Sequence, residues 1–146
     1  MLSIKRIYEK KSPDDGIRIY VDRLWPRGLT KTQAAMDEWL KDISPSVDLR
    51  KWFGHQPEKF PEFKQRYMSE MLNPGFSEKL KYIADLAQKQ KVTLLYSAKN
   101  EQYNNAVVVA GLINSIMKKT KTGKNKSEKI RDRFGSHKLS DKTIGQ

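Results

Sequence analysis

With 146 residues, the chain is long enough for one domain with a real core but short for two. It contains no cysteine, which excludes disulfides, thiolate nucleophiles and cysteine-ligated zinc or iron–sulfur sites. Its 2 histidines, His55 and His137, are too few for a histidine-rich metal site, so we expect no metal and no cofactor. The net charge of +12 is uneven, because residues 118–146 hold 10 Lys and Arg against 3 Asp and Glu.

No stretch of the sequence carries a signal for export or for membrane insertion. The N-terminus lacks the apolar core of a signal peptide, and no run approaches the roughly 20 apolar residues that a membrane-spanning helix needs. We therefore expect a soluble protein of the cytoplasm without a membrane partner.

Two strands open the chain. Residues 1–8 have apolar side chains at strand spacing, and residues 9–16 contain Ser-Pro and Asp-Gly, which are both turn signals. Residues 17–24 alternate strictly between apolar and polar side chains, which predicts a strand with one firmly buried face. The apolar positions of this second strand are Ile17, Ile19 and Val21.

Helices are predicted for the middle of the chain. Pro26 ends the second strand, because proline cannot donate to the ladder and restricts the residue before it. Thr30 or Thr32 then caps a short helix, and residues 37–43 fit either a helix or a short extra strand. Further helices are expected over residues 47–53, capped by Ser46, over residues 58–72, which an Asn-Pro-Gly turn ends, and over residues 77–90.

The third strong strand is predicted at residues 92–96, which are apolar almost throughout, as in an interior strand of a parallel sheet. A polar loop and an apolar helix over residues 106–117 follow and complete a βα unit. We therefore predict an α/β protein with a small, mostly parallel sheet flanked by helices, in a single domain over residues 1–117. Residues 118–146 lack apolar periodicity and are predicted to form a flexible, disordered basic tail.

Polar and charged side chains gather at the ends of the second and third strands. In a parallel sheet these two ends lie together, at the edge where open α/β sheets usually bind ligands. The N-terminus of the helix beginning near Asn104 would point there too, and its free backbone N–H groups favour anions. We therefore predict a site for a small phosphate- or carboxylate-bearing ligand, with or without catalysis. The candidate residues are Asp22, Arg23, Trp25, Arg27, Lys31, Ser97, Lys99, Asn104 and Asn105.

Several of these residues also have a purely structural interpretation. Asp22 could act as a general base, although a structural salt bridge is the commoner role of such an acid. His55 could be an acid–base group near the cleft or a surface residue after a helix. Trp25 could stack on a planar ligand or belong to the core, and Asn104 with Asn105 could cap a helix. The sequence has no phosphate loop and no nucleophile elbow, which lowers the weight of the best-marked enzyme classes.

The basic tail suggests an alternative function. Its excess of Lys and Arg would attract nucleic acid through salt-sensitive phosphate contacts, so a nucleic-acid-associated module using the basic cluster and the tail is the second hypothesis. The tail lacks the interleaved aromatic residues that suit single-strand binding, since Phe134 stands alone. A third hypothesis is an interaction-mediating domain whose strand-end charges are structural.

Three separated motifs carry a family resemblance: VDRLWPRGLTK, DEWLKDISPSVDLRKWFGH and VTLLYSAKNEQYNNAVVV. In this order they resemble the bacterial YeaO-like branch of the domain of unknown function 488 family, over roughly residues 3–115. The resemblance implies a small α/β domain in the cytoplasm and brings no established reaction, cofactor or catalytic residue. Longer relatives in the wider family carry cysteines near the last strand–helix junction, where this chain has Ser97, Asn104 and Asn105.

Overall fold

The fold is built around one parallel sheet. A computed structural model describes the backbone of residues 1–134 and the side chains of residues 1–120. The four strands have the order β1-β4-β2-β3, and every neighbouring pair is parallel. The strands are β1 (Leu2–Arg6), β2 (Ile17–Tyr20), β3 (Glu38–Trp39) and β4 (Val92–Tyr96), and the helices are α1 (Lys31–Ala34), α2 (Val47–Phe53), α3 (Phe60–Glu70), α4 (Pro74–Lys89) and α5 (Asn105–Phe134).

The α/β prediction is confirmed. The predicted site also required a parallel sheet in which the ends of the second and third predicted strands lie together, and the sheet meets this condition. β2 and β4 are hydrogen-bonded neighbours, with Ile17 opposite Val92 and Tyr20 opposite Leu95. Because the pair is parallel, both strands end at the same edge of the sheet. β1 lies on the other side of β4 and ends there as well.

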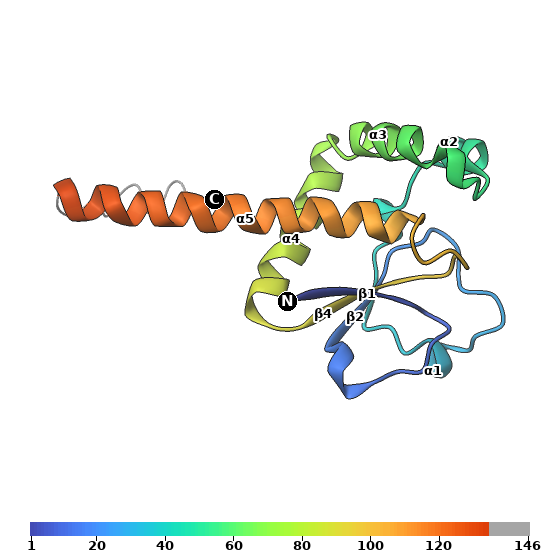
Figure 1. The fold of residues 1–146 in the computed structure, drawn as a ribbon. Helices are drawn as coiled ribbons and strands as arrows, with labels where there is room; N and C mark the ends of the chain where they lie inside the picture. The colour runs from blue at the N-terminus through green and yellow to red at the C-terminus, as the bar shows by residue number, and fades with distance from the viewer. Residues whose placement is uncertain (135–146) are drawn as a thin grey trace.

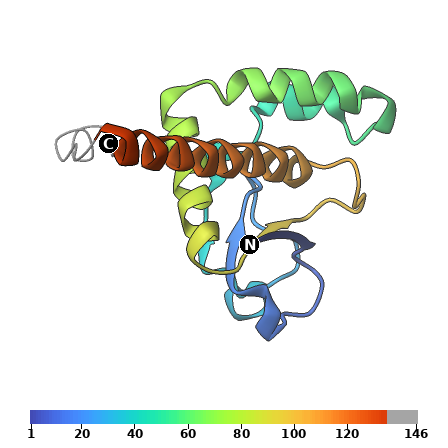
Figure 2. The same cartoon turned by 60° about the vertical axis from the view of Figure 1, so that its left-hand side comes forward.

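The main core lies on the face of the sheet that α4 and α5 cover. The two helices cross each other over this face in both views (Figures 1 and 2). The core includes Ile19 and Leu94 from the sheet, Ile83 from α4, and Val109 and Ile113 from α5, all fully buried. Burying an aliphatic side chain of this size contributes roughly 1.5–3 kcal/mol. These contacts hold α5 against the sheet and place its first residues above the strand ends.

The prediction that β2 buries only one face is wrong. Arg18 and Tyr20, the polar positions of the alternating pattern, are as fully buried as Ile19. A second, smaller cluster of Ile7, Tyr20, Ala34 and Leu95 covers this face, with α1 and the segment before β2 below the sheet (Figure 1). Both faces are covered because α4 and α5 pack on one face, while α1 and the segment that contains Asp15 pack on the other.

One alternative that the sequence left open is resolved, and several element bounds differ from those expected. The ambiguous segment 37–43 forms the two-residue strand β3 and a 3-10 turn, and β2 ends at Tyr20 rather than at residue 24. α4 begins at Pro74, because Asn73 caps it through a bond from the Gly75 N–H. α5 continues past Met117, where the apolar periodicity ends, through Phe134. The flexibility of the basic tail and the domain boundary at residue 117 stay predictions.

Residues 135–146, the end of that tail, lie outside the part of the chain that the structure describes. Within the described residues, no helix combines the length and apolarity needed to cross a membrane.

Candidate functional site

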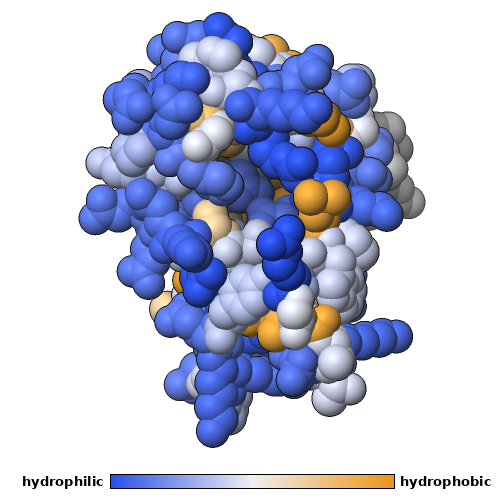
Figure 3. Space-filling model, turned by 90° about the vertical axis from the view of Figure 1, so that its right-hand side faces the viewer, coloured by the Kyte–Doolittle hydropathy of each residue, from blue (hydrophilic) through white to orange (hydrophobic). Residues whose placement is uncertain are grey.

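A cavity of about 910 Å³ opens at the edge of the sheet where the parallel strands end. Seen from this side, the surface is hollowed, with mostly hydrophilic side chains and a few apolar ones around the hollow (Figure 3). The cavity collects residues from the ends of β1, β2 and β4, from α2 and the loop after it, and from the start of α5. The predicted site residues that line it are Asp22, Arg23, Trp25, Arg27, His55, Ser97, Lys99, Asn104 and Asn105.

Lys31 is the one predicted ligand-binding residue that does not line the cavity. It is the exposed first residue of α1, and Thr30 caps this helix by accepting a bond from the Gln33 N–H at 3.1 Å. α1 packs through Ala34 on the smaller core cluster, on the other side of the sheet from α4 and α5. Lys31 is near the other site residues in sequence, but α1 places it away from the strand ends.

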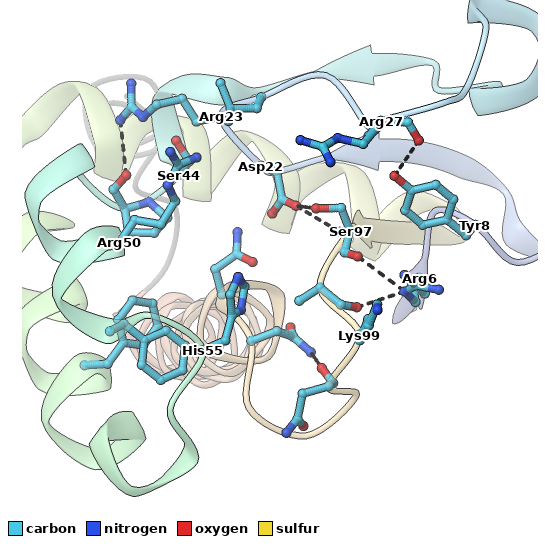
Figure 4. Close-up of a pocket in the computed structure, with 18 of the residues that line it drawn as sticks. Arg6, Tyr8, Asp22, Arg23, Arg27, Ser44, Arg50, His55, Ser97 and Lys99 are labelled. Atoms are coloured by element: carbon cyan, nitrogen blue, oxygen red, sulfur yellow. Dashed lines mark hydrogen bonds between the residues drawn. The ribbon is translucent and has the colours of Figure 1, made fainter.

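Asp22 joins the ends of β2 and β4. Its Oδ2 atom accepts from the backbone N–H of Ser97 at 2.8 Å and from the Ser97 hydroxyl at 2.5 Å (Figure 4). The Tyr20 hydroxyl lies 3.4 Å from the same oxygen and donates to Leu24 O at 2.9 Å. Burial, with the nearby negative charge of Asp22, raises the pKa of Tyr20 above its usual value of 10.0, so this hydroxyl stays protonated. Asp22 is therefore held by serine rather than by the arginine salt bridge that the sequence suggested.

Replacing Ser97 with Ala is expected to lower the free energy of unfolding by about 1–2 kcal/mol, because a hydrogen bond to a charged group is lost. The carboxylate keeps the bond from the backbone N–H at position 97, so the effect is limited. Urea denaturation measures it, and Ser115→Ala, at an exposed position on α5, is the control with an expected change below about 0.5 kcal/mol. Equal effects of the two substitutions would contradict the bond's role.

A first group of cations lies beside the end of β1. The Arg6 Nε–H donates to Ser97 O at 3.3 Å and to Ala98 O at 3.0 Å. Its guanidinium lies 4.6 Å from the centre of the Tyr8 ring, and the Tyr8 hydroxyl donates to Arg27 O at 2.8 Å. These contacts bring Arg6 and Arg27 to the cavity with Lys99, which follows Ala98 in the chain. Sequence reasoning missed Arg6 and Tyr8, although a parallel β1 places its last residue at this edge.

A second group of cations comes from the end of β2 and from α2. Arg23 donates from Nη2 to Pro45 O at 3.2 Å, and its Nε–H is buried without a hydrogen-bond partner among the described residues. Arg50 extends from α2, which begins after the Ser46 cap, and it lines the same cavity. Sequence reasoning missed Arg50, because nothing in the local pattern shows that α2 packs beside the strand ends.

The cations of the cavity are not neutralised by carboxylates of the described chain. Its ion pairs at 4.0 Å or closer join Lys5 and Arg18 to Asp15, Arg66 to Glu62, and Lys79 to Asp42. None of these pairs includes a cation of the cavity. Asp22 is the one acidic side chain among the lining residues. The cavity cations are Arg6, Arg23, Arg27, Arg50 and Lys99.

The two asparagines at the start of α5 serve mainly to position it. Asn104 is buried; its side chain accepts from the Val107 N–H at 3.1 Å and donates to Asn100 O at 2.9 Å. The Asn105 amide donates to Val21 O at 3.1 Å and so ties α5 to the end of β2. The helix-cap interpretation is therefore confirmed for Asn104. The tie places the positive N-terminal end of α5 beside the cavity.

Trp25 and His55 lie at the rim of the cavity. Trp25 is 40% exposed, donates from Nε1 to Leu29 O at 2.7 Å and packs edge-on against Trp39. Trp25 is therefore a surface aromatic residue that these contacts hold in place, rather than a core residue. His55 follows the α2 stop at Gly54 and is exposed, with a left-handed φ of 58°. In the described residues, no group of three His, Asp or Glu side chains could hold a metal ion.

Comparisons with known proteins show the family of the chain. The family model described as "Inactive DUF488-N3 subclade" matches residues 1–130. The chain belongs to this family. It is 44% identical over 115 residues to "Uncharacterized protein YeaO" of Escherichia coli (strain K12), a match that covers 79% of this chain and 98% of that protein. An uncharacterized protein of Mycobacterium tuberculosis (strain ATCC 25618 / H37Rv) is 39% identical over 111 residues, or 76% of this chain and 92% of the relative. No solved structure matches the chain.

Proposed function

We propose that this protein binds a small anionic ligand, bearing phosphate or carboxylate, in the cavity at the carboxyl ends of its strands. The observation that carries the proposal is the charge balance of the lining, which has five cations and a single carboxylate. In the described chain none of these cations forms an ion pair. Holding several unpaired positive charges around one cavity costs free energy that a bound anion recovers through charge-assisted hydrogen bonds.

Two further features support an anion as the ligand. The buried Nε–H of Arg23 has no acceptor in the described residues, and a ligand oxygen could supply one. The N-terminal end of α5, which the Asn105 bond to Val21 O holds beside the cavity, adds a partial positive charge. The cavity volume of about 910 Å³ lies within the usual range of small-molecule sites and exceeds what a lone phosphate ion would fill.

Binding without catalysis is the version of the function that we favour. The matching family model is described as inactive. Asp22, one of two predicted acid–base candidates, has its Oδ2 atom bound to Ser97 and leaves only Oδ1 for a substrate. His55, the other candidate, is exposed at the rim. A general base needs both a free acceptor and a nearby substrate proton.

The test is calorimetric titration of the wild type with inorganic phosphate and a panel of phosphorylated and carboxylated metabolites, repeated on Arg27→Ala. Arg27→Ala is expected to weaken binding by about tenfold to a hundredfold, because a charge-assisted hydrogen bond contributes about 1.5–3 kcal/mol. Lys31→Ala is the matched control, since Lys31 lies on the next segment of chain but outside the cavity. If no anion binds, or if the two variants bind equally, the proposal is wrong.

Nucleic acid is the competing ligand, because residues 118–146 hold 10 basic against 3 acidic residues. A nucleic-acid module would bind DNA or RNA oligonucleotides with an affinity that falls steeply with salt, and it would lose this binding when the chain is truncated after Met117. The small-ligand proposal expects the truncated chain to bind the anion with unchanged affinity. Fluorescence anisotropy with labelled oligonucleotides at several salt concentrations separates the two functions.

A further inference from the structure

The cations of the cavity form two groups on opposite sides of Asp22 (Figure 4). The β1-side group is Arg6, Arg27 and Lys99, and the α2-side group is Arg23 and Arg50.

Separate contacts hold the two groups. In the β1-side group, Tyr8 packs on Arg6 and its hydroxyl donates to the Arg27 carbonyl, while Arg6 itself donates to the carbonyl just before Lys99. In the α2-side group, Arg23 donates to Pro45 O, in the segment that leads into α2 and Arg50. The cavity therefore presents two distinct places where an anionic group can be bound.

Asp22 lies between the two groups and opposes a negative charge at the centre of the cavity. Both hydrogen bonds from Ser97 go to its Oδ2 atom, and the Tyr20 hydroxyl, which donates to Leu24 O, lies beside the same oxygen. Its Oδ1 atom accepts no hydrogen bond from the described residues and is free to accept one from a ligand. A carboxylate in this position repels an anion and favours a hydroxyl or an ammonium group.

From this arrangement we infer that the ligand carries two anionic groups, one for each cationic group, joined by a spacer with a hydroxyl or amino group that donates to Asp22. The inference rests on the proposed function and names the class of ligand. A ligand with one anionic group would leave the other cationic group unpaired. Binding of the second anionic group is intramolecular once the first is bound, so a linked ligand gains affinity from both.

The test uses α,ω-alkane bisphosphonates of increasing chain length, each compared with the alkyl monophosphonate of equal length. Calorimetry is expected to show, at one best length, a bisphosphonate that binds at least about tenfold more tightly than its monophosphonate partner. A parallel series of α,ω-dicarboxylates reports whether phosphate or carboxylate is preferred. Two equal anionic groups give a bisphosphonate a purely statistical advantage of about twofold over the monophosphonate. If the difference in affinity does not exceed this factor at any chain length, the inference is overturned.

Variants separate the contributions of the two cationic groups. Arg27→Ala and Arg50→Ala are each expected to weaken binding of the best bisphosphonate by about tenfold or more. Binding of a monophosphonate is expected to be weakened by only one of the two substitutions. Lys31→Ala, outside the cavity, is expected to leave both probes unchanged. An amino group on the spacer is expected to strengthen binding to the wild type but not to Asp22→Asn, which lacks the negative charge.

The outcomes distinguish this inference from the proposed function. If phosphate, monophosphonates and bisphosphonates all fail to bind, the proposed function itself is wrong. If monophosphonates and bisphosphonates bind equally and Arg27→Ala weakens both while Arg50→Ala weakens neither, the anion site stands and the two-anion ligand is wrong. If the amino group gives the same gain in Asp22→Asn as in the wild type, the role given to Asp22 is wrong.

Discussion

Replacing Asp15 with Ala is expected to lower the free energy of unfolding by about 3–5 kcal/mol, because it leaves a buried arginine without its counter-charge. Arg18 has no exposed surface, and its Nη1 atom lies 2.6 Å from Asp15 Oδ2. Its other nitrogens donate to Ala34 O at 3.0 Å and Ala35 O at 2.8 Å, which are neutral groups. Lys5 also binds Asp15, at 3.0 Å, so the substitution removes the partner of two cations at once.

Urea denaturation at neutral pH measures this effect. Asp14→Ala is the matched control, since Asp14 is the exposed neighbour of Asp15 in the 3-10 turn Pro13–Asp15. A change below about 0.5 kcal/mol is expected for the control. If Asp15→Ala cost no more than Asp14→Ala, the buried network would contribute nothing to stability.

The same carboxylate gives the protein a pH dependence. Burial alone would raise the pKa of Asp15, but hydrogen bonds from the Ser12 N–H, Lys5 and Arg18 outweigh it and lower the pKa below the usual value of 3.8. The stabilisation is therefore complete above the unfolded-state pKa, near 3.8, and is lost as the pH falls through the lower folded-state pKa. The difference in unfolding free energy between wild type and Asp15→Asn should accordingly shrink below about pH 4.

The second large effect is expected for Phe63→Ala, which should cost about 3–5 kcal/mol through lost burial and the cavity left behind. Phe63 is 1% exposed, stacks on Phe53 with ring centroids 4.3 Å apart, and packs at 5.5 Å against Tyr67. Both phenylalanines also line the cavity, so the substitution removes part of an apolar wall of the candidate site. Ligand affinity should fall together with stability.

Two comparisons make the measurement specific. Phe63→Leu, which keeps most of the apolar volume, should cost less than Phe63→Ala. Leu72→Ala, at a position 80% exposed, should change the unfolding free energy by less than about 0.5 kcal/mol. A Phe63→Ala cost as small as that of Leu72→Ala would show that α2 and α3 do not depend on this aromatic contact.

Local sequence patterns predicted most elements because those patterns act over short distances. A near-continuous apolar run predicted β4, whose five residues are all buried. The Ser46 cap and the stop at Gly54, which has a left-handed φ of 53°, predicted both ends of α2. Propensity alone could not assign residues 37–43, because the strand β3 exists only through its pairing with β2.

Some residues of the candidate site could be predicted from the sequence, and others could not. Strand ends are visible in a sequence, so Asp22, Arg27 and Ser97 were predicted to lie at one edge of a parallel sheet, and the structure places them there. Arg50 and Lys31 show the limit of this reasoning. Helix packing alone decides that Arg50 of α2 lines the cavity and that Lys31 of α1 does not.

By itself, the sequence determined the α/β class, the type of most elements and the polar character of the strand ends, because short-range periodicity and turn chemistry specify these features. Only the tertiary structure decided which cations share a cavity and which polar residues are buried. Arg18 shows why: its alternating pattern predicts an exposed position, yet α1 and the segment before β2 cover this face of the sheet. Burial of a charge depends on partners distant in the fold, here Asp15 and the end of α1.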